Sequence, residues 1–427
     1  MRWHAVLAVL VVAASLVAAM VIVLRAQSVP GSSAPEISAP ATTSPSPPTA
    51  TAPTSTPTAR SPGPAADTVH VDDRHRARYG GRYVGWDELL DSGRPLPRAG
   101  SGCRADWTTT RRDAALNWKK ASYVCLDQLT GRGFKPQGVG GSGSTADYRI
   151  GGRAAAHRNI VLVSSYSTVD ELGLRFAHRP GKTAATRLTA IDLDRGRFNQ
   201  VELVRPVGSD GFAALDSHGS GFVWVGQYMY ASSRGSLWMF NADDLMEIDG
   251  RHVLPAVAGW RVRGVGALSS IGVDRSTAGT RLTGINYTES GTAWAQSFAL
   301  SPDGRLATGS RRAKQPLDLL RSFGPVPAAI SSTRSSVVAG TNFQGIGAAG
   351  PYRFVNSSSL MLDGRRHGDT LVVLRKNEPI ARFAMPEENI ESVYVDYRRR
   401  RYVTVTEHGR QFLFWLPLDH LIDRAER

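Results

Sequence analysis

The stretch Phe222-Val-Trp-Val-Gly-Gln-Tyr-Met-Tyr-Ala-Ser-Ser-Arg-Gly-Ser-Leu-Trp-Met-Phe240 contains three short runs of apolar and aromatic residues with turn residues between them. A second stretch near the C-terminus repeats this pattern as Val393-Tyr-Val-Asp, followed by Arg401-Tyr-Val-Thr-Val-Thr-Glu-His-Gly-Arg-Gln-Phe-Leu-Phe-Trp415. Each stretch reads as a short apolar strand, a Tyr-rich strand and a Gly turn into an aromatic strand. The repeat indicates an architecture built from copies of one antiparallel sheet.

Similar short runs, rich in β-branched and aromatic residues, continue through most of the chain. Gly, Asp, Asn and Pro separate them, and no helical period intervenes, so a sandwich, a barrel or a propeller is predicted. The predicted strands are Ile160–Tyr166, Arg187–Leu193, Gln200–Val204, Phe222–Val225, Tyr228–Ala231, Leu237–Phe240, Arg281–Tyr287, Thr292–Leu300, Tyr352–Val355, Thr370–Leu374, Ile380–Phe383, Ser392–Val395, Tyr402–Thr406 and Phe412–Leu416.

A second repeat consists of small residues, which the innermost strands of a propeller favour because these strands crowd around the axis. Gln137-Gly138-Val139 recurs as Gln344-Gly345-Ile346, and small-residue runs also occur at His218–Gly221 and Leu268–Gly272. Innermost strands are therefore predicted to start near residues 137, 215, 267, 343 and 391. The predicted fold class is all-β, a β-propeller with five blades, six being the alternative, and Ser122–Leu126 is the candidate strand that closes the last blade.

The N-terminal segment predicts a membrane anchor. Ala5–Leu24 is an uninterrupted run of 20 uncharged residues, long enough as a helix to match the ~30 Å hydrocarbon core of a bilayer. An uncleaved signal-anchor, with residues 1–4 as a cytoplasmic tip, is favoured over a cleaved signal peptide, whose apolar run is shorter. The domain beyond the membrane is therefore expected to be extracellular on a single-pass membrane protein; secretion after cleavage is the alternative.

A Pro/Ser/Thr/Ala-rich linker is expected over residues 25–70, because 10 of the 39 residues from Ser28 to Ala66 are Pro and such a segment has little to bury. Residues 71–135 are predicted to form an N-terminal cap with short helices near Trp86–Leu90 and Asp113–Lys120 and the closing strand. The propeller is expected over residues 136–418, with a helical insertion near Lys314–Gly324, and residues 419–427 form a C-terminal tail. Cys103 and Cys125 are predicted to form a disulfide, the default for two cysteines in an oxidising compartment.

Several segments together resemble an uncharacterised family of actinobacterial secreted proteins. They are Cys125-Leu-Asp, Pro136-Gln-Gly138, His218-Gly-Ser-Gly, Trp224-Val-Gly-Gln-Tyr-Met-Tyr230, Leu237-Trp-Met-Phe240, Gln344-Gly345 and Thr406-Glu407-His408, spread over roughly residues 103–416. Ser220 stands where the family has Gly, and Asn241 stands where it tends to have Asp. The resemblance implies a propeller-like secreted protein, and it carries over no catalytic residue.

Four polar residues on predicted innermost strands are candidates to face a ligand: Gln137, His218, Gln344 and Glu391. Propellers commonly bind ligands on the axis, where these side chains would form a polar ring. His218 would act there as a ligand-binding group or a base, or alternatively be hydrogen-bonded within the fold. Glu391, Asn389 and Asp274 are residue types that hold calcium in lactonase-type propellers, but nothing in the sequence brings them together, so neither a metal nor a cofactor is assigned.

The run Arg398-Arg-Arg-Arg401 is a candidate polyanion-binding site in a chain of net charge +14, the alternative being a solvated hairpin turn between Tyr397 and Tyr402. No phosphate-cradling Gly loop, Gly-x-Ser-x-Gly elbow or metal-binding Cys/His spacing occurs in the sequence. The expected partners are the cytoplasmic membrane, through Ala5–Leu24, and anionic cell-wall polymers or an envelope protein, with no nucleic acid. The predicted function is a binding or scaffold module at the cell envelope. The alternative is a lactonase- or hydrolase-like propeller enzyme with an axial site around His218 and Glu391.

Overall fold

In the computed structural model the chain divides into two units, Met1–Ala65 and Ala66–Arg427, and every described residue belongs to the second. The predicted membrane span Ala5–Leu24, the whole linker 25–70 and the predicted helical insertion at Lys314–Gly324 lie outside the described residues. Within the described residues, no helix has the length and apolar character needed to cross a bilayer. The structure describes residues 73–97, 105, 116–145, 147–167, 185–207, 209–215, 217–233, 236–263, 268–276, 279–287, 293–306, 328–331, 334–338, 342–358, 361–362, 365–366, 368–387 and 389–427.

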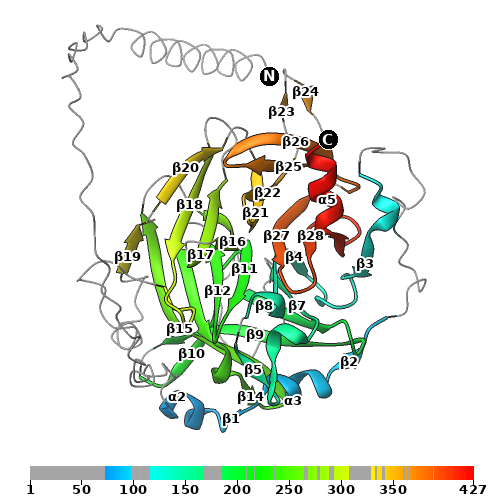
Figure 1. The fold of residues 1–427 in the computed structure, drawn as a ribbon. Helices are drawn as coiled ribbons and strands as arrows, with labels where there is room; N and C mark the ends of the chain where they lie inside the picture. The colour runs from blue at the N-terminus through cyan, green and yellow to red at the C-terminus, as the bar shows by residue number, and fades with distance from the viewer. Residues whose placement is uncertain are drawn as a thin grey trace, which may run out of the picture. The chain divides into compact units, whose positions relative to one another are not determined.

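The described strands form five four-stranded antiparallel meanders (Figure 1). The first two contain β4 (Phe134–Gly141), β7 (Ile160–Ser167), β8 (Ala185–Asp192) and β9 (Arg197–Val207), then β11 (Gly221–Val225), β12 (Tyr228–Ser233), β13 (Ser236–Asn241) and β15 (Arg251–Arg263). The third and fourth contain β16 (Leu268–Ser276), β17 (Gly279–Asn286), β18 (Ala293–Ala299) and β20 (Arg334–Val338), then β21 (Phe343–Ala349), β22 (Tyr352–Ser357), β25 (Thr370–Arg375) and β26 (Glu378–Ala384). The fifth contains β27 (Ile390–Asp396), β28 (Arg401–Thr406), β29 (Phe412–Pro417) and β3 (Ser122–Cys125).

The first strands of the five meanders lie next to one another in a ring. β4 contacts β11, β11 contacts β16, β16 contacts β21, β21 contacts β27, and β27 returns to contact β4. Meanders radiating from such a ring make a β-propeller, which confirms the predicted all-β propeller class. Every strand predicted from the alternating runs overlaps an observed strand.

The predicted closing strand is confirmed. β3 comes from chain that precedes the first meander, yet it pairs with β29 of the fifth, with Cys125 opposite Phe412 and Ser122 opposite Trp415 (Figure 1). Tyr123 adds an edge-to-face contact with the Phe412 ring at 5.8 Å between centroids. Cys103 lies outside the described residues, so its disulfide with Cys125 stays a prediction.

The first two meanders join into one larger sheet through a strand that the sequence does not predict. In β15, His252–Pro255 pairs in parallel with Val201–Val204 of β9, while the later part of β15 pairs with β13. Pro255 and Gly259 make this segment look interrupted, but Pro255 occupies the last position of the parallel ladder, where a missing N–H costs little. Short strands outside the meanders are β1 (Arg82–Tyr83), β2 (Arg94–Pro95), β5 (Arg149–Ile150), β6 (Arg153–Ala154), β10 (Gly211–Ala214), β14 (Met246–Ile248), β19 (Ala328–Ser331), β23 (Met361–Leu362) and β24 (Arg365–Arg366).

Helices are few and short among the described residues. α3 (Trp86–Asp91) forms where predicted and buries its Trp86 and Leu90 side chains; the Trp86 indole N–H donates to the carbonyl of Ala242 at 3.0 Å. The segment named as a C-terminal tail, residues 419–427, is largely helical, because α5 (Leu418–Ala425) buries Leu421 against the fifth meander. The remaining helical segments are α2 (Asp73–Arg78) and the 3-10 turns η2 (Trp118–Lys120), η3 (Ser142–Ser144), η4 (Ala155–His157) and η5 (Ala242–Asp244).

The apolar core lies between neighbouring meanders. Trp224 of β11 is fully buried and its ring lies 4.8 Å from that of Trp86, so α3 is packed against the second meander. Between the fourth and fifth meanders, the rings of Phe354 and Tyr402 lie 6.3 Å apart. Aromatic side chains of this size dominate packing energetics, and truncating one typically costs about 3–5 kcal/mol.

Candidate functional site

Four of the five innermost strands carry a β-bulge near their start. In β4, β16 and β21 one residue of the innermost strand has no partner on the paired strand, and in β27 two residues stand opposite one. The bulges lie between Pro136 and Gly138, Leu268 and Ser270, Phe343 and Gly345, and Ile390 and Val393. A bulge bends its strand and redirects a side chain, and bulges are over-represented next to functional sites. The bulged residues are Gln137, Ser269, Gln344 and Glu391 with Ser392.

The bulged side chains meet at one cavity. Its volume is about 330 Å³, and it lies at the end of the propeller where the innermost strands begin. All four residues predicted to face a ligand line this cavity. The complete lining is Gln137, His218, Ser220, Leu268, Ser269, Tyr287, Gln344, Glu391 and Glu407.

Two glycines make room for this arrangement. A Cβ on Gly345 would lie 2.7 Å from the carbonyl oxygen of Glu391, and a Cβ on Gly138 would lie 2.5 Å from that of Gly219. Neighbouring innermost strands can approach so closely only where side chains are missing. The repeated Gln-Gly pair of the sequence therefore has a structural meaning: Gln turns into the cavity from the bulge, and Gly allows the next strand to pass.

The axis is closed directly behind the cavity. Ser270 of β16 and Ser392 of β27 are fully buried, and their hydroxyl oxygens are hydrogen-bonded at 3.2 Å. These two strands belong to meanders that are not adjacent in the ring, so this contact spans the axis. The cavity is therefore a pocket open at one end of the propeller, with a polar floor.

Glu391 is the most unusual residue of the pocket. Only 2% of it is exposed, and its Oε2 atom has no hydrogen-bond partner among the described residues. Burial, followed by the negative charges of Glu407 and Asp369 and the hydrogen bond with Glu407, raises the pKa of the Glu391 carboxyl well above its usual value. A raised pKa favours the protonated form of a carboxyl group, which can donate a hydrogen bond.

Glu407 forms the second acidic element of the pocket. It follows β28, and its Oε1 atom accepts a hydrogen bond of 2.6 Å from the Tyr166 hydroxyl. The Tyr166 ring in turn stacks on His218, with centroids 4.0 Å apart and an angle of 25° between the rings. His218 Nδ1 lies 3.1 Å from the hydroxyl of Ser220, which fixes the orientation of the imidazole at the rim.

His218 does not lie in an innermost strand as predicted. Residues 217–220 form a connection that precedes β11, which begins at Gly221. Gly219 adopts a positive φ of 65°, and its carbonyl accepts a hydrogen bond from the Ser164 hydroxyl at 2.7 Å, so the chain turns here and cannot continue a strand ladder. The turn still places His218 in the pocket.

The lining contains neither lysine nor arginine. It offers two amides, hydroxyl groups, the imidazole of His218, the carboxyl groups of Glu391 and Glu407, and Tyr287, which is 42% exposed. Of the three residues considered for calcium, only Glu391 lines the pocket; Asp274 lies six residues beyond Leu268 on β16, on the order of 20 Å further along the strand. No group of three or more metal-ligating side chains is found within the described part of the chain.

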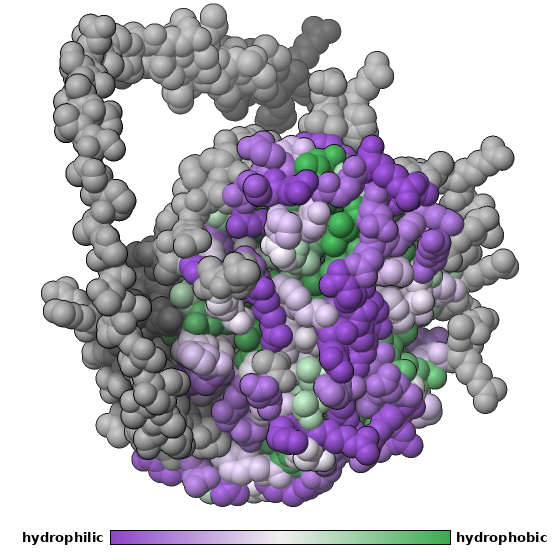
Figure 2. Space-filling model, in the orientation of Figure 1, coloured by the Kyte–Doolittle hydropathy of each residue, from purple (hydrophilic) through white to green (hydrophobic). Residues whose placement is uncertain are grey.

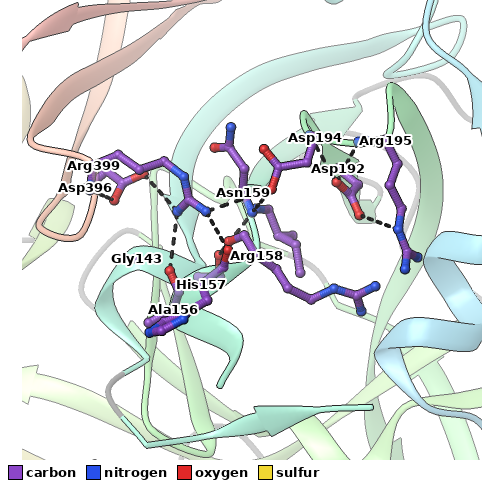
Figure 3. A network of polar contacts seen from close by, with 12 residues as sticks. Gly143, Ala156, His157, Arg158, Asn159, Asp192, Asp194, Arg195, Asp396 and Arg399 are labelled. Atoms are coloured by element: carbon purple, nitrogen blue, oxygen red, sulfur yellow. Dashed lines mark hydrogen bonds and ion pairs between the residues drawn. The ribbon is translucent and has the colours of Figure 1, made fainter. Parts of the chain in front are cut away.

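The predicted polyanion site at Arg398–Arg401 is largely occupied by the protein itself. These residues form the turn between β27 and β28, as the solvated-turn alternative predicts. Arg400 pairs with Asp419, its Nε atom 2.8 Å from Oδ2, and Arg401 donates to Asp396 at 2.7 Å. Arg399 donates to the carbonyl of His157 at 3.0 Å, as Figure 3 shows, and lies 3.6 Å from the Asp396 carboxylate. Only Arg398 lacks an ion pair within the described residues, so the run does not present four free cations.

Several pocket residues were not predicted as site residues: Ser220, Leu268, Ser269, Tyr287 and Glu407. Glu407 was present in the sequence only as part of the Thr406-Glu407-His408 segment, and its role depends on Tyr166, which is far away in the sequence. Ser269 lies in the small-residue run at Leu268–Gly272. Its bulge occupies the same position in β16 as the Gln bulges occupy in β4 and β21, so alignment of this run with the Gln-Gly repeats is the signal that points to Ser269.

No protein-family model matches the chain, and no curated protein matches it. Among solved structures, the chain is similar to the β-propeller domain of Cps50 (Swd1) from Myceliophteria thermophila. The two are 7% identical, the match covers 69% of this chain and 99% of that one, and the TM-score is 0.32. The propeller assignment therefore depends on the strand topology described above.

Proposed function

We propose that this protein is a five-bladed, membrane-anchored, extracytoplasmic propeller that binds a small, uncharged, hydroxyl-rich ligand such as a saccharide in its axial pocket. Each of the five meanders is one blade, and the anchor is Ala5–Leu24. The observation that carries the proposal is the convergence of bulged polar residues from several blades on one pocket, together with the buried Glu391 Oε2 atom that has no partner among the described residues.

The chemistry of the lining supports an uncharged polar ligand. Gln137 and Gln344 provide both donors and acceptors, a protonated Glu391 donates, and Glu407 accepts, which matches a ligand whose groups are hydroxyls. An anion would meet the carboxyl group of Glu407 and no lysine or arginine, so anionic polymers are disfavoured here. A volume of about 330 Å³ lies at the lower end of the range for small-molecule sites.

The outer surface gives less support for a scaffold role. Figure 2 shows that the visible face of the described residues is mostly hydrophilic, with apolar residues in small, separated areas. Stable protein docking usually needs a larger contiguous apolar area. This face therefore offers no large apolar docking area among its described residues, and we favour small-ligand binding in the axial pocket on the evidence of its lining.

The test is a panel of neutral mono- and disaccharides, measured by thermal shift and then by calorimetry on the purified chain. We expect at least one saccharide to bind and Gln344→Ala to weaken it about tenfold or more, because a buried polar partner is left unpaired. Gln227→Ala, an amide substitution outside the pocket lining, is the matched control and should leave binding unchanged. The proposal fails if no saccharide binds, or if Gln344→Ala binds as tightly as the unmodified protein.

A hydrolase or lactonase is the second candidate, favoured by the pairing of a protonated Glu391 with Glu407. A protonated carboxyl beside a second carboxyl provides the acid and base that hydrolysis needs. Incubating the panel, together with simple lactones and nitrophenyl esters, and following product release separates the two candidates. Turnover that Glu391→Gln abolishes while binding persists would identify an enzyme, whereas binding without turnover supports the binding module.

The anchor is tested separately by fractionating host membranes. We expect the full chain to remain in the membrane fraction after a high-salt wash and to retain its N-terminus. A mature N-terminus near Gln27 would instead identify a cleaved, secreted protein.

A further inference from the structure

A second pocket lies at the other end of the first meander. β4 begins near the axial pocket and ends at Gly141, and the chain then passes through η3, the β5–β6 hairpin and η4 before β7 begins at Ile160. This connection and the turn after β8 enclose a pocket of about 520 Å³. The lining is Arg149, Gly152, Arg153, Ala154, His157, Arg158, Asp192, Asp194 and Arg195.

The two carboxylates of this pocket are engaged by the protein. Asp192 is 1% exposed, and its Oδ1 atom accepts hydrogen bonds of 3.1 Å from the backbone N–H groups of Asp194 and Arg195. The Asp194 carboxylate accepts from the backbone N–H of Asn159 at 3.2 Å and lies 4.0 Å from Arg399 (Figure 3). Asp192 also lies 3.9 Å from the Arg195 guanidinium, whereas no ion pair joins either carboxylate to Arg149, Arg153 or Arg158 among the described residues.

Three of the four arginines have no ion pair within the described residues. Arg149 donates only to the carbonyl of Gly152, at 3.1 Å, and Arg153 is exposed. The Nη1 atom of Arg158 is buried and has no hydrogen-bond partner among the described residues. The fourth, Arg195, pairs with Asp91 outside the pocket.

Arg149, Arg153 and Arg158 line the same pocket. Figure 3 shows Arg158 extending away from Arg399, and Arg195 reaching toward Asp192 from a separate segment. A buried guanidinium N–H without an acceptor is costly, and like charges on one small pocket repel each other. Both costs are removed when an oxyanion occupies the pocket, because guanidinium groups bind phosphate and carboxylate oxygens in a planar, two-pronged geometry.

We propose that this pocket binds a phosphate group through Arg149, Arg153 and Arg158. Its chemistry is the opposite of that of the axial pocket, and the two sites are independent of each other. Phosphate is the natural match for several arginines around one pocket, because its three or more oxygens can each accept from a different guanidinium. The anion site predicted from the sequence at Arg398–Arg401 is replaced by this neighbouring pocket, because the guanidinium groups of that run are mostly paired.

The test measures binding of inorganic phosphate, of glycerol 3-phosphate and of phosphatidylglycerol vesicles to the full chain at low salt. We expect binding in at least one arm, weakened about tenfold or more by Arg158→Gln or by Arg149→Gln. Arg382→Gln removes an exposed arginine on β26, in another meander, and is the charge-matched control that should bind normally. The melting temperature of each variant shows whether it is folded, and the exposed Arg149 gives a variant that perturbs packing least.

The arms separate the sources of the phosphate. Binding of the soluble phosphates identifies a small-molecule or polymer phosphate, and binding of vesicles alone identifies a lipid headgroup; either result supports the site. Absence of binding in all three arms, or equal binding by Arg149→Gln, Arg158→Gln and the unmodified protein, overturns it. Saccharide binding in the axial pocket is unaffected by either outcome, so the two proposals fail separately.

Discussion

Glu391→Gln tests whether the proton held by the buried Glu391 is linked to folding. The substitution keeps the size and shape of the side chain but removes the ionisable group. In the folded protein, burial and the nearby charges of Glu407 and Asp369 raise the pKa of Glu391 well above the ordinary value of 4.5. In the unfolded chain these causes are absent, so the unfolded state releases the proton at a lower pH than the folded state does.

The sign of the effect follows from this difference. Because the folded pKa is the higher one, the stabilisation by proton binding is fully present below about pH 4.5 and is lost as the pH rises toward the folded pKa. The free energy of unfolding falls by about 1.4 kcal/mol for each pH unit in that window. For the roughly 360 residues of Ala66–Arg427, an unfolding entropy of ~2.1 cal/mol/K per residue converts this to about 2 °C in melting temperature per pH unit.

The assay is thermal unfolding, followed by circular dichroism, of the unmodified protein and Glu391→Gln between pH 5 and pH 8. Other groups titrate in both proteins, so the difference between the two curves isolates Glu391. We expect the variant to gain stability relative to the unmodified protein as the pH rises. Glu378→Gln removes an exposed carboxyl from β26 and should give a curve parallel to that of the unmodified protein. Parallel curves for Glu391→Gln as well would refute the reasoning.

Three further substitutions test the structure around the pocket and the ring closure. Tyr166→Phe removes the 2.6 Å hydrogen bond to Glu407 and should cost about 1.5–3 kcal/mol in chemical denaturation; no change would show that this hydrogen bond does not contribute to stability. Gly345→Ala places a methyl group 2.7 Å from backbone atoms of β27 and should destabilise by about 1–3 kcal/mol, whereas Gly368→Ala, with open space around it, should be nearly neutral. Val124→Pro disrupts the ladder between β3 and β29 and should lower stability by about 3 kcal/mol or more, measured by thermal unfolding; a smaller loss than from Val124→Ala would argue against ring closure by β3.

Much of the propeller could be predicted from local patterns, because each of its meanders is formed by residues close in sequence. The Tyr-rich and aromatic runs predict their strands because apolar and polar residues alternate with a period of two within each segment. Even the closing strand was predictable, since the last meander has only three strand-like runs of its own and the Ser122–Leu126 run offers a fourth. β15 was missed because Pro255 and Gly259 are local signals for a break, and a parallel ladder with β9 overrides them.

The pocket could be predicted in part, for a similar reason. Gln137 and Gln344 share a Gln-Gly pattern that marks the bulge and the close strand passage, so their convergence follows from the repeat. The partners of Glu407 and of Arg400 could not be predicted. They are Tyr166 and Asp419, which only the closed ring and the C-terminal helix bring into contact.

Salt dependence distinguishes the two proposed sites for any new ligand. The net charge of +14 describes neither of them, because the axial pocket is lined by Glu391 and Glu407 while the pocket beside β5 and β6 is lined by four arginines. Binding of an uncharged ligand releases no counterions, so affinity in the axial pocket should change little with ionic strength. Binding of a phosphate to exposed arginines is screened by salt, so its affinity should fall steadily as salt is added.

These two responses assign any new ligand to a pocket. A ligand whose affinity falls with salt, and is weakened by Arg149→Gln but not by Gln344→Ala, occupies the arginine pocket. A ligand whose affinity does not change with salt, and is weakened by Gln344→Ala but not by Arg149→Gln, occupies the axial pocket. A salt-insensitive ligand that depends on Arg149 would contradict this assignment of charge to the two ends of the propeller.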